Sequence, residues 1–161
     1  MNWAHIHLAL NHIPVLGTMF GLSLLAYAML RRNDLLKKAA CNVFVAVALL
    51  ALPVYFTGEP AEEVVESTAG ISKAAIDAHE QSALLSLVGV ELLGVVGLIG
   101  LFAAARGRPV SSRVTGTAFA LSLATAALMA RTANLGGQIH HEEIRAGAPA
   151  SAPEREIGEA R

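Results

Sequence analysis

The chain has 161 residues, of which 54% are apolar and only 16% charged, whereas a soluble domain carries about 25% charged residues. A soluble protein of this length could not bury so much apolar surface in one core. The net charge of −1 lacks the basic excess of a nucleic-acid-binding protein. The single cysteine excludes an internal disulfide framework and any cysteine-based zinc or iron–sulfur site. The composition therefore indicates a protein whose partner is the lipid bilayer.

Four long apolar runs divide the chain, and only Glu91 places a charge inside one of them. Each run has the length of a membrane-spanning helix, which needs about 20 apolar residues with a range of about 17–25. The sequence thus predicts an all-α, integral membrane four-helix bundle within residues 1–145. Its expected spans are 13–30, 39–57, 80–105 and 114–135.

Lysine and arginine favour cytoplasmic connections, and seven of them fall in two short connections. These residues are Arg31, Arg32, Lys37, Lys38, Arg106, Arg108 and Arg113. The two connections carry a net charge of +6, and the segments on the opposite side carry −6. We therefore expect both connections on the cytoplasmic side and both termini outside.

Glycine, proline and serine mark the segments between the spans. Gly58-Glu59-Pro60 is expected to begin a short helix in the outer loop 59–79, and Ser72 to cap a helix that continues into the third span. Gly136–Gly137 is expected to end the fourth span. Glycines within the first and third spans are expected to let neighbouring helices approach closely; they are Gly17, Gly21, Gly94, Gly97 and Gly100. Residues 146–161, rich in Ala, Pro, Gly and charge, are predicted to form a flexible or partner-bound tail.

All six histidines lie outside the spans or at their outer ends. They are His5, His7, His12, His79, His140 and His141. His12 precedes the first span, His79 precedes the third, and His140 follows the fourth. Histidine avoids lipid in any case, so the presence of all six histidines on one side is weak evidence for a binding site. Their placement at the same level on three helices is stronger evidence.

Imidazoles at one depth on neighbouring helices are typical of haem b, whose iron takes axial histidines from two helices. The sequence predicts His12 and His79 as ligands, and the alternates are His140 and His7. Arg131 is placed to neutralise a haem propionate or, alternatively, to snorkel to headgroups. A non-haem metal held with nearby glutamates and a bundle with no cofactor are the other readings. No C-x-x-C-H motif occurs, which excludes covalently attached haem c.

Glu91 lies near the bilayer midplane, where a carboxylate costs ~2.5–3.5 kcal/mol. It shares a helix face with Glu80, about 16 Å away along the axis. The pair suits a proton path or a hydrogen bond to a quinone. Alternatively, Glu91 bonds to a hydroxyl of a neighbouring helix, such as Thr125, and only holds the helices together.

The segment His7-Leu-Ala-Leu-Asn-His12-Ile-Pro14 resembles the H-P-x-x-x-H-F-P pattern that begins the first helix of a widespread bacterial family of four-helix membrane proteins. That family is known chiefly as a domain of unknown function. Thr57–Glu62, His79-Glu80 and Leu135–Gly137 are also similar to segments of its members. The resemblance covers most of the chain up to about residue 141.

The resemblance implies a compact bundle with the layout of a small cytochrome b, multi-pass in the bacterial inner (cytoplasmic) membrane. It carries over His7, His12 and His79. Leu8 stands where the family has proline, and His140–His141 stands where an apolar or aromatic pair is expected. That departure suggests an extra ligand or a variant site.

Three functions follow as hypotheses. The first is a redox subunit that binds haem b near the outer face and passes electrons between a periplasmic partner and membrane quinone. The second is a non-catalytic anchor or interaction subunit of a larger complex, and the third is a metal-handling membrane protein. We expect the protein to be an electron-transfer or accessory subunit rather than a stand-alone enzyme. The acidic outer loop, with Glu59, Glu62, Glu63 and Glu66, predicts a basic partner such as a periplasmic cytochrome or another subunit.

Overall fold

A computed structural model describes residues 2–66 and 72–141. These residues form helices joined by short connections, and none of them lies in a strand. The helices are α1 Trp3–Leu10, α2 His12–Leu30, α3 Asp34–Phe56, α4 Gly58–Glu66, α5 Lys73–Ala105 and α6 Ser112–His140. The all-α prediction is confirmed, and the predicted tail 146–161 lies outside the described residues.

Four stretches of helix are long and apolar enough to cross a membrane, in agreement with the four predicted spans. They are Trp3–Leu30, Asp34–Glu66, Lys73–Ala105 and Ser112–Ile139. Helix α5 has 33 residues and is therefore about 50 Å long, whereas the hydrocarbon core of a bilayer is about 30 Å thick. As predicted, one continuous helix forms the third span and extends beyond the apolar layer.

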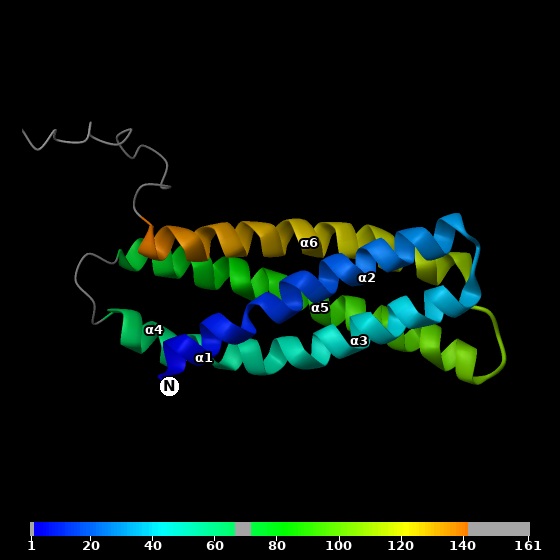
Figure 1. Ribbon diagram of the computed structural model, residues 1–161, viewed down its shortest axis with the longest axis horizontal. Helices are drawn as coiled ribbons and strands as arrows, with labels where there is room; N and C mark the ends of the chain where they lie inside the picture. Colours follow the sequence, from blue (N-terminus) through cyan, green and yellow to red (C-terminus); the bar gives the residue numbers. More distant parts are fainter. Residues whose placement is uncertain (1, 67–71, 142–161) are drawn as a thin grey trace, which may run out of the picture.

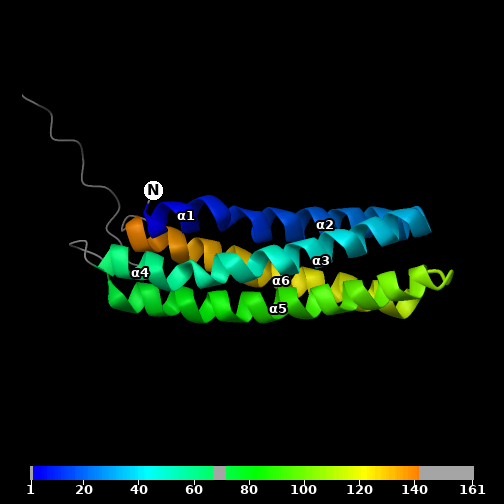
Figure 2. The same ribbon diagram turned by 90° about the horizontal axis from the view of Figure 1, so that it is seen from below.

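The helices lie side by side along one long axis, so that their connections gather at two ends (Figure 1, Figure 2). The histidine end holds α1, α4, the start of α5 and the end of α6. The basic end holds the α2–α3 turn at residues 31–33 and the α5–α6 connection at residues 106–111. Both ends of the described chain thus lie on one side of the bundle. That this side faces outward stays a prediction from the charges.

Helix α5 packs against α3 and α6, and glycines bring its backbone close to α3. A Cβ atom on Gly97 would lie 2.9 Å from the carbonyl oxygen of Cys41, and one on Gly100 would lie 2.9 Å from the Cys41 Sγ. Gly21 likewise lets α2 pack closely against α3, because the ring of Phe44 from α3 fills the space that a side chain would take. These glycines allow the close helix packing that the sequence predicts for them.

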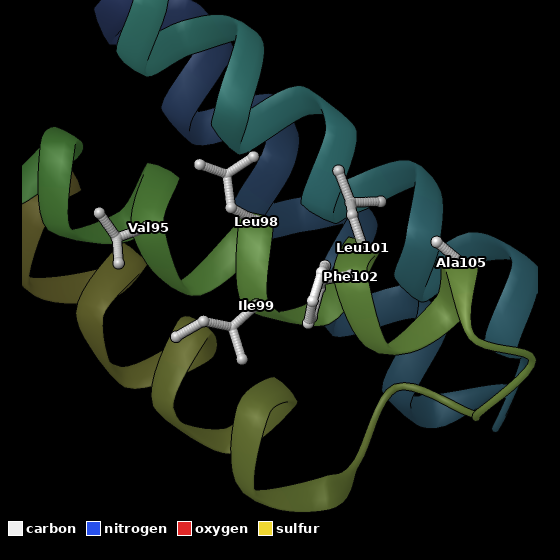
Figure 3. A pocket seen from close by; sticks show the side chains of 6 residues that line it. All are labelled: Val95, Leu98, Ile99, Leu101, Phe102 and Ala105. Carbon is white, nitrogen blue, oxygen red and sulfur yellow. The ribbon is translucent and has the colours of Figure 1, made fainter.

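The core is a column of apolar side chains between the helices, and the surface around it is also apolar. Its central cluster consists of Leu25, Ala40, Phe44, Leu93 and Ala118. On the outside, exposed apolar side chains of α5 line an open groove toward the basic end (Figure 3). The guanidinium of Arg106 stacks over the ring of Phe102, 3.7 Å from its centre. An apolar outer surface that ends in arginine is what a bilayer and its headgroups require.

Side-chain caps begin three of the helices, α1, α3 and α6, and a break without a side-chain cap at Asn11 divides the first span into α1 and α2. The Oδ1 atoms of Asn2 and Asn33 accept the N–H groups of His5 and Leu36 at 3.0 and 3.1 Å, and they begin α1 and α3. Helix α1 ends at Asn11, whose N–H donates to the carbonyl oxygen of residue 7 at 2.9 Å. Residue 72 occupies the N-cap position of α5 as predicted, but its side chain makes no capping bond.

The predicted helix end at Gly136–Gly137 is wrong, because α6 continues through both glycines to His140. Neither glycine has the left-handed backbone of a helix cap, which Gly107 does show, with a φ of 72°. Glycine inside a helix costs only about 1 kcal/mol relative to alanine. Gly136 instead gives room to the ring of His79, whose Cε1 would lie 3.0 Å from a Cβ at that position.

Gly97→Ala is expected to destabilise the bundle by about 1–3 kcal/mol, because the added methyl group meets the backbone of α3 and cannot be accommodated by a side-chain rotation. Gly116→Ala in α6 is the matched control, because a Cβ there meets no atom within 4 Å. Helix propensity alone should leave that variant equal to or slightly more stable than the wild type. Thermal unfolding in detergent, followed by circular dichroism, measures both. Equal stability of the two variants would contradict the close α3–α5 contact.

Candidate functional site

His7 is held where α1 meets the junction of α3 and α4. Its Nδ1 atom lies 3.2 Å from the carbonyl oxygen of Val54 and 3.0 Å from Thr57 Oγ1. Because a carbonyl oxygen only accepts, Nδ1 carries the hydrogen and donates it. The Thr57 hydroxyl donates in turn to the same carbonyl oxygen at 2.7 Å. The half-buried ring is thus fixed through Nδ1, and Nε2 makes no hydrogen bond within the described part of the chain.

His79 is held in the same way between α5 and α6. Its Nδ1 atom donates to the carbonyl oxygen of Thr132 at 3.0 Å, and its half-buried ring lies against Gly136. Here too the main chain accepts the hydrogen, so Nε2 keeps the lone pair. No described residue forms a hydrogen bond with that nitrogen.

Thr132 joins the two helices through its hydroxyl as well. Its Oγ1 atom lies 2.8 Å from Ser82 Oγ and 2.9 Å from Ser86 Oγ, and it donates to the carbonyl oxygen of Leu128 at 3.0 Å. With its own hydrogen used, Thr132 Oγ1 accepts from both serines through its two lone pairs. Three hydroxyls and one imidazole on two helices therefore form one hydrogen-bonded group, named here the Thr132 network.

His7 and His79 both lie at the histidine end, His7 in α1 and His79 in the first two turns of α5. They come from residues 72 positions apart in the chain (79 − 7) and are anchored to different helices. Both anchors use Nδ1, so each ring presents Nε2 as an electron-pair donor.

The remaining histidines are placed differently. His12, predicted as a ligand, is exposed, and its Nδ1 donates to the carbonyl oxygen of Leu8 one turn earlier at 3.1 Å. His5 and His141 are exposed as well. The side chain of His140 lies outside the described residues. Among the predicted ligands whose side chains the structure describes, His7 and His79 are half-buried and donate to a carbonyl oxygen of another helix, whereas His12 does neither.

The other predicted site residues differ in exposure and in hydrogen bonding. Arg131 and Glu80 are exposed. Glu91 is half-buried, and its Oε1 atom has no hydrogen-bond partner among the described residues. The Oγ1 atom of Thr125 has none there either, so the alternative in which these two residues bond to each other is wrong. A role of Glu80 and Glu91 in a proton path or quinone contact stays a prediction.

No group of three or more His, Cys, Asp or Glu side chains capable of holding a metal ion occurs in residues 2–66 and 72–141. A zinc or non-haem iron site usually takes at least three protein ligands. A haem iron takes at most two, because the porphyrin supplies four nitrogens. What the described residues offer is thus a pair of imidazoles.

Sequence reasoning missed the residues that bond to the two rings, namely Val54, Thr57 and Thr132, and the two serines that bond to Thr132, Ser82 and Ser86. A signal for part of this group does exist. His79, Ser82 and Ser86 are spaced three and four residues apart, which places them on one face of a helix. Their common partner on α6 cannot be read from spacing, because it depends on how α5 and α6 are aligned.

Comparison with protein-family models, with curated proteins and with solved structures finds no match for this chain. The fold defines its class: an all-helical protein with four helices long and apolar enough to span a membrane.

Thr132→Val is expected to destabilise the protein by about 1 kcal/mol, because it leaves the hydroxyls of two buried serines without their acceptor. Thr132→Ser retains the hydroxyl and should keep most of the stability. The comparison is made by unfolding in detergent. If the valine and serine variants unfold alike, the Thr132 network does not hold α5 against α6.

Proposed function

We propose that the chain is a membrane redox subunit that binds haem b at the histidine end. The observation that carries this proposal is the matched anchoring of His7 and His79. In both rings Nδ1–H donates to a main-chain carbonyl oxygen of another element, at 3.2 and 3.0 Å. This is the arrangement that metal-binding histidines use, since the anchor fixes the tautomer and raises the basicity of the other nitrogen.

The donor set agrees with haem in chemistry and in number. Two neutral imidazoles from two elements supply the two axial positions that haem b requires. Gly136 beside His79 and Gly58 beside His7, whose Cε1 lies 3.7 Å from a Cβ at that position, carry no side chain that would crowd the rings. The proposal therefore gives His7 the position that the sequence favours for His12, with His12 and His140 as alternates.

Each residue then has a separate part in the proposed site. His7 and His79 donate Nε2 electron pairs, and the carbonyl groups of Val54 and Thr132 hold their rings in orientation. Bound haem would supply a one-electron carrier close to one membrane surface. Arg131 is the candidate cation for a propionate. Glu91 is the candidate protonatable group toward a membrane quinone.

The outer location of the site would place it near a periplasmic electron donor or acceptor. This assignment rests on the positive-inside distribution of lysine and arginine. The subunit would then pass electrons between that partner and quinone in the membrane.

Purified protein, expressed with haem supplied, should show a Soret band and reduced α and β bands. His7→Ala and His79→Ala should each lose most of the bound haem, because each removes one axial ligand. His5→Ala is the matched control, since this exposed histidine lies on the same short helix as His7. Added imidazole should restore part of the spectrum to either ligand variant. A folded, colourless wild type, or full haem content in both variants, would refute the proposal.

A second candidate function, that of an interaction subunit, is favoured by the acidic surface of α4. This surface consists of Glu59, Glu62, Glu63 and Glu66. The helix packs against α1 and its Ala61 is buried. The Nζ of Lys73 joins it to α5 by an ion pair of 2.7 Å with Glu66. Glu59 and Glu63 are exposed. A held, negatively charged helix attracts a basic partner and speeds its encounter at low salt.

Replacing Glu59 and Glu63 with glutamine should slow the association of a basic cytochrome c with the protein and flatten its dependence on ionic strength. The ion pair at Glu66 is left intact in this variant, so α4 should stay in place. Arg108→Gln, which removes an exposed charge at the basic end, is the control and should leave association unchanged. Stopped-flow measurements of the association rate at several salt concentrations distinguish the glutamine variant from the control. An unchanged rate in the glutamine variant would show that partners do not dock on α4.

A further inference from the structure

A cavity of about 350 Å³ lies at the basic end, between the α2–α3 turn and the first turn of α6. It lies at the opposite end of the bundle from α1 and the start of α5, which carry His7 and His79. Its lining residues are Met29, Arg32, Lys37, Ser112 and Thr115. Two of the five are cations, none is an acid, and one offers an exposed hydroxyl.

Lys37 makes only a long ion pair, and no hydrogen bond from the side chain of Arg32 or Lys37 occurs within the described residues. The nearest carboxylate to Lys37 is Asp34, but its Oδ1 atom is 3.8 Å from the lysine Nζ, which is too long for a hydrogen bond. That same oxygen accepts the N–H of Val110 at 3.1 Å. The other carboxyl oxygen lies 3.6 Å from Lys38. The Lys37 ammonium group thus keeps its donors while its side chain is only 19% exposed.

Arg32 enters the cavity from a turn that holds it in place. It has a positive φ of 49°, a conformation that residues other than glycine rarely adopt. The turn is closed by two hydrogen bonds, from the N–H of Arg32 to the carbonyl oxygen of Met29 at 3.2 Å and from that of Asn33 to the carbonyl oxygen of Ala28 at 3.0 Å. The guanidinium offers a planar set of donors that suits phosphate oxygens.

The surroundings of the cavity suit an amphiphile rather than a free ion. The candidate membrane spans end at Leu30 and begin again at Asp34 and Ser112, so the cavity lies at the level where lipid headgroups lie. At the end of α2, Met29 lines the cavity and Leu30 follows it in the chain; these apolar side chains are 37% and 82% exposed. An acyl chain would lie against this surface while its headgroup occupies the cavity.

We propose that this cavity binds the phosphate group of an anionic phospholipid from the leaflet at the basic end. Arg32 and Lys37 bind the phosphate oxygens, Ser112 donates its hydroxyl, and Met29 contacts the start of an acyl chain. Basic pockets between membrane helices are suited to such headgroups, since each cation near the surface strengthens the attraction to an anionic lipid. The bound lipid joins α2, α3 and α6 at an end where the turns are short.

The test uses the full chain in nanodiscs of phosphatidylcholine with increasing phosphatidylglycerol. Phosphatidylglycerol should raise the thermal stability of the wild type, and native mass spectrometry should show lipid retained on the protein. Arg32→Gln with Lys37→Gln should weaken the apparent lipid affinity about tenfold or more. Lys37→Gln alone, which leaves the strained turn unchanged, should weaken it by a smaller factor.

Arg31→Gln with Arg108→Gln is the matched control, because it removes the same charge from two exposed residues that do not line the cavity. It should retain the affinity of the wild type within about twofold, a difference of about 0.4 kcal/mol. An equal loss in both double variants would overturn the proposal in favour of unspecific attraction. Stabilisation by inorganic phosphate in pure phosphatidylcholine discs, to the extent seen with phosphatidylglycerol, would overturn it in favour of a free ion.

Discussion

The contact between α5 and α3 sets the position of every group that α5 carries. At Gly97 a side chain would meet the backbone of α3, and at Gly94 and Gly100 it would meet the side chains of Ala48 and Cys41, so larger residues at these positions would push the two helices apart. The same helix then meets α6 through Ser82 and Ser86, which bond to Thr132. The glycine contacts with α3 and the serine hydrogen bonds to α6 together fix the rotation of α5 and its position along the bundle axis.

That alignment decides the chemistry available at the histidine end. His79 donates to the carbonyl oxygen of the same threonine of α6 whose hydroxyl bonds to the serines about one and two turns further along α5. His7 is held by the carbonyl oxygen of Val54, close to the point where α3 gives way to α4. Both rings are therefore oriented by main-chain groups, which do not titrate and do not change with redox state. A pair of imidazoles fixed in this way is preorganised for a ligand.

The two ends of the bundle differ in charge as well as in shape. At the histidine end, α4 adds an acidic surface, whereas the basic end is closed by a tight turn and a short connection rich in arginine. In a bilayer, these two ends would meet different surroundings, a soluble partner on one side and anionic headgroups on the other. Both proposals use this polarity, but they rest on different residues at opposite ends of the protein.

The sequence by itself determined the four spans, the long continuous α5, the short helix after Gly58 and the packing role of the glycines, because apolar length and local capping are properties of neighbouring residues. It also singled out the histidines, but it ranked His12 above His7 and expected Gly136–Gly137 to end a helix that in fact continues. Only the tertiary structure decided which imidazoles are anchored to another helix, and it revealed Thr132 and Thr57 among the residues that hold them. The physical reason is that a hydrogen bond between helices depends on their relative rotation and alignment, which are set by packing along the whole length of the bundle and leave no mark in local spacing.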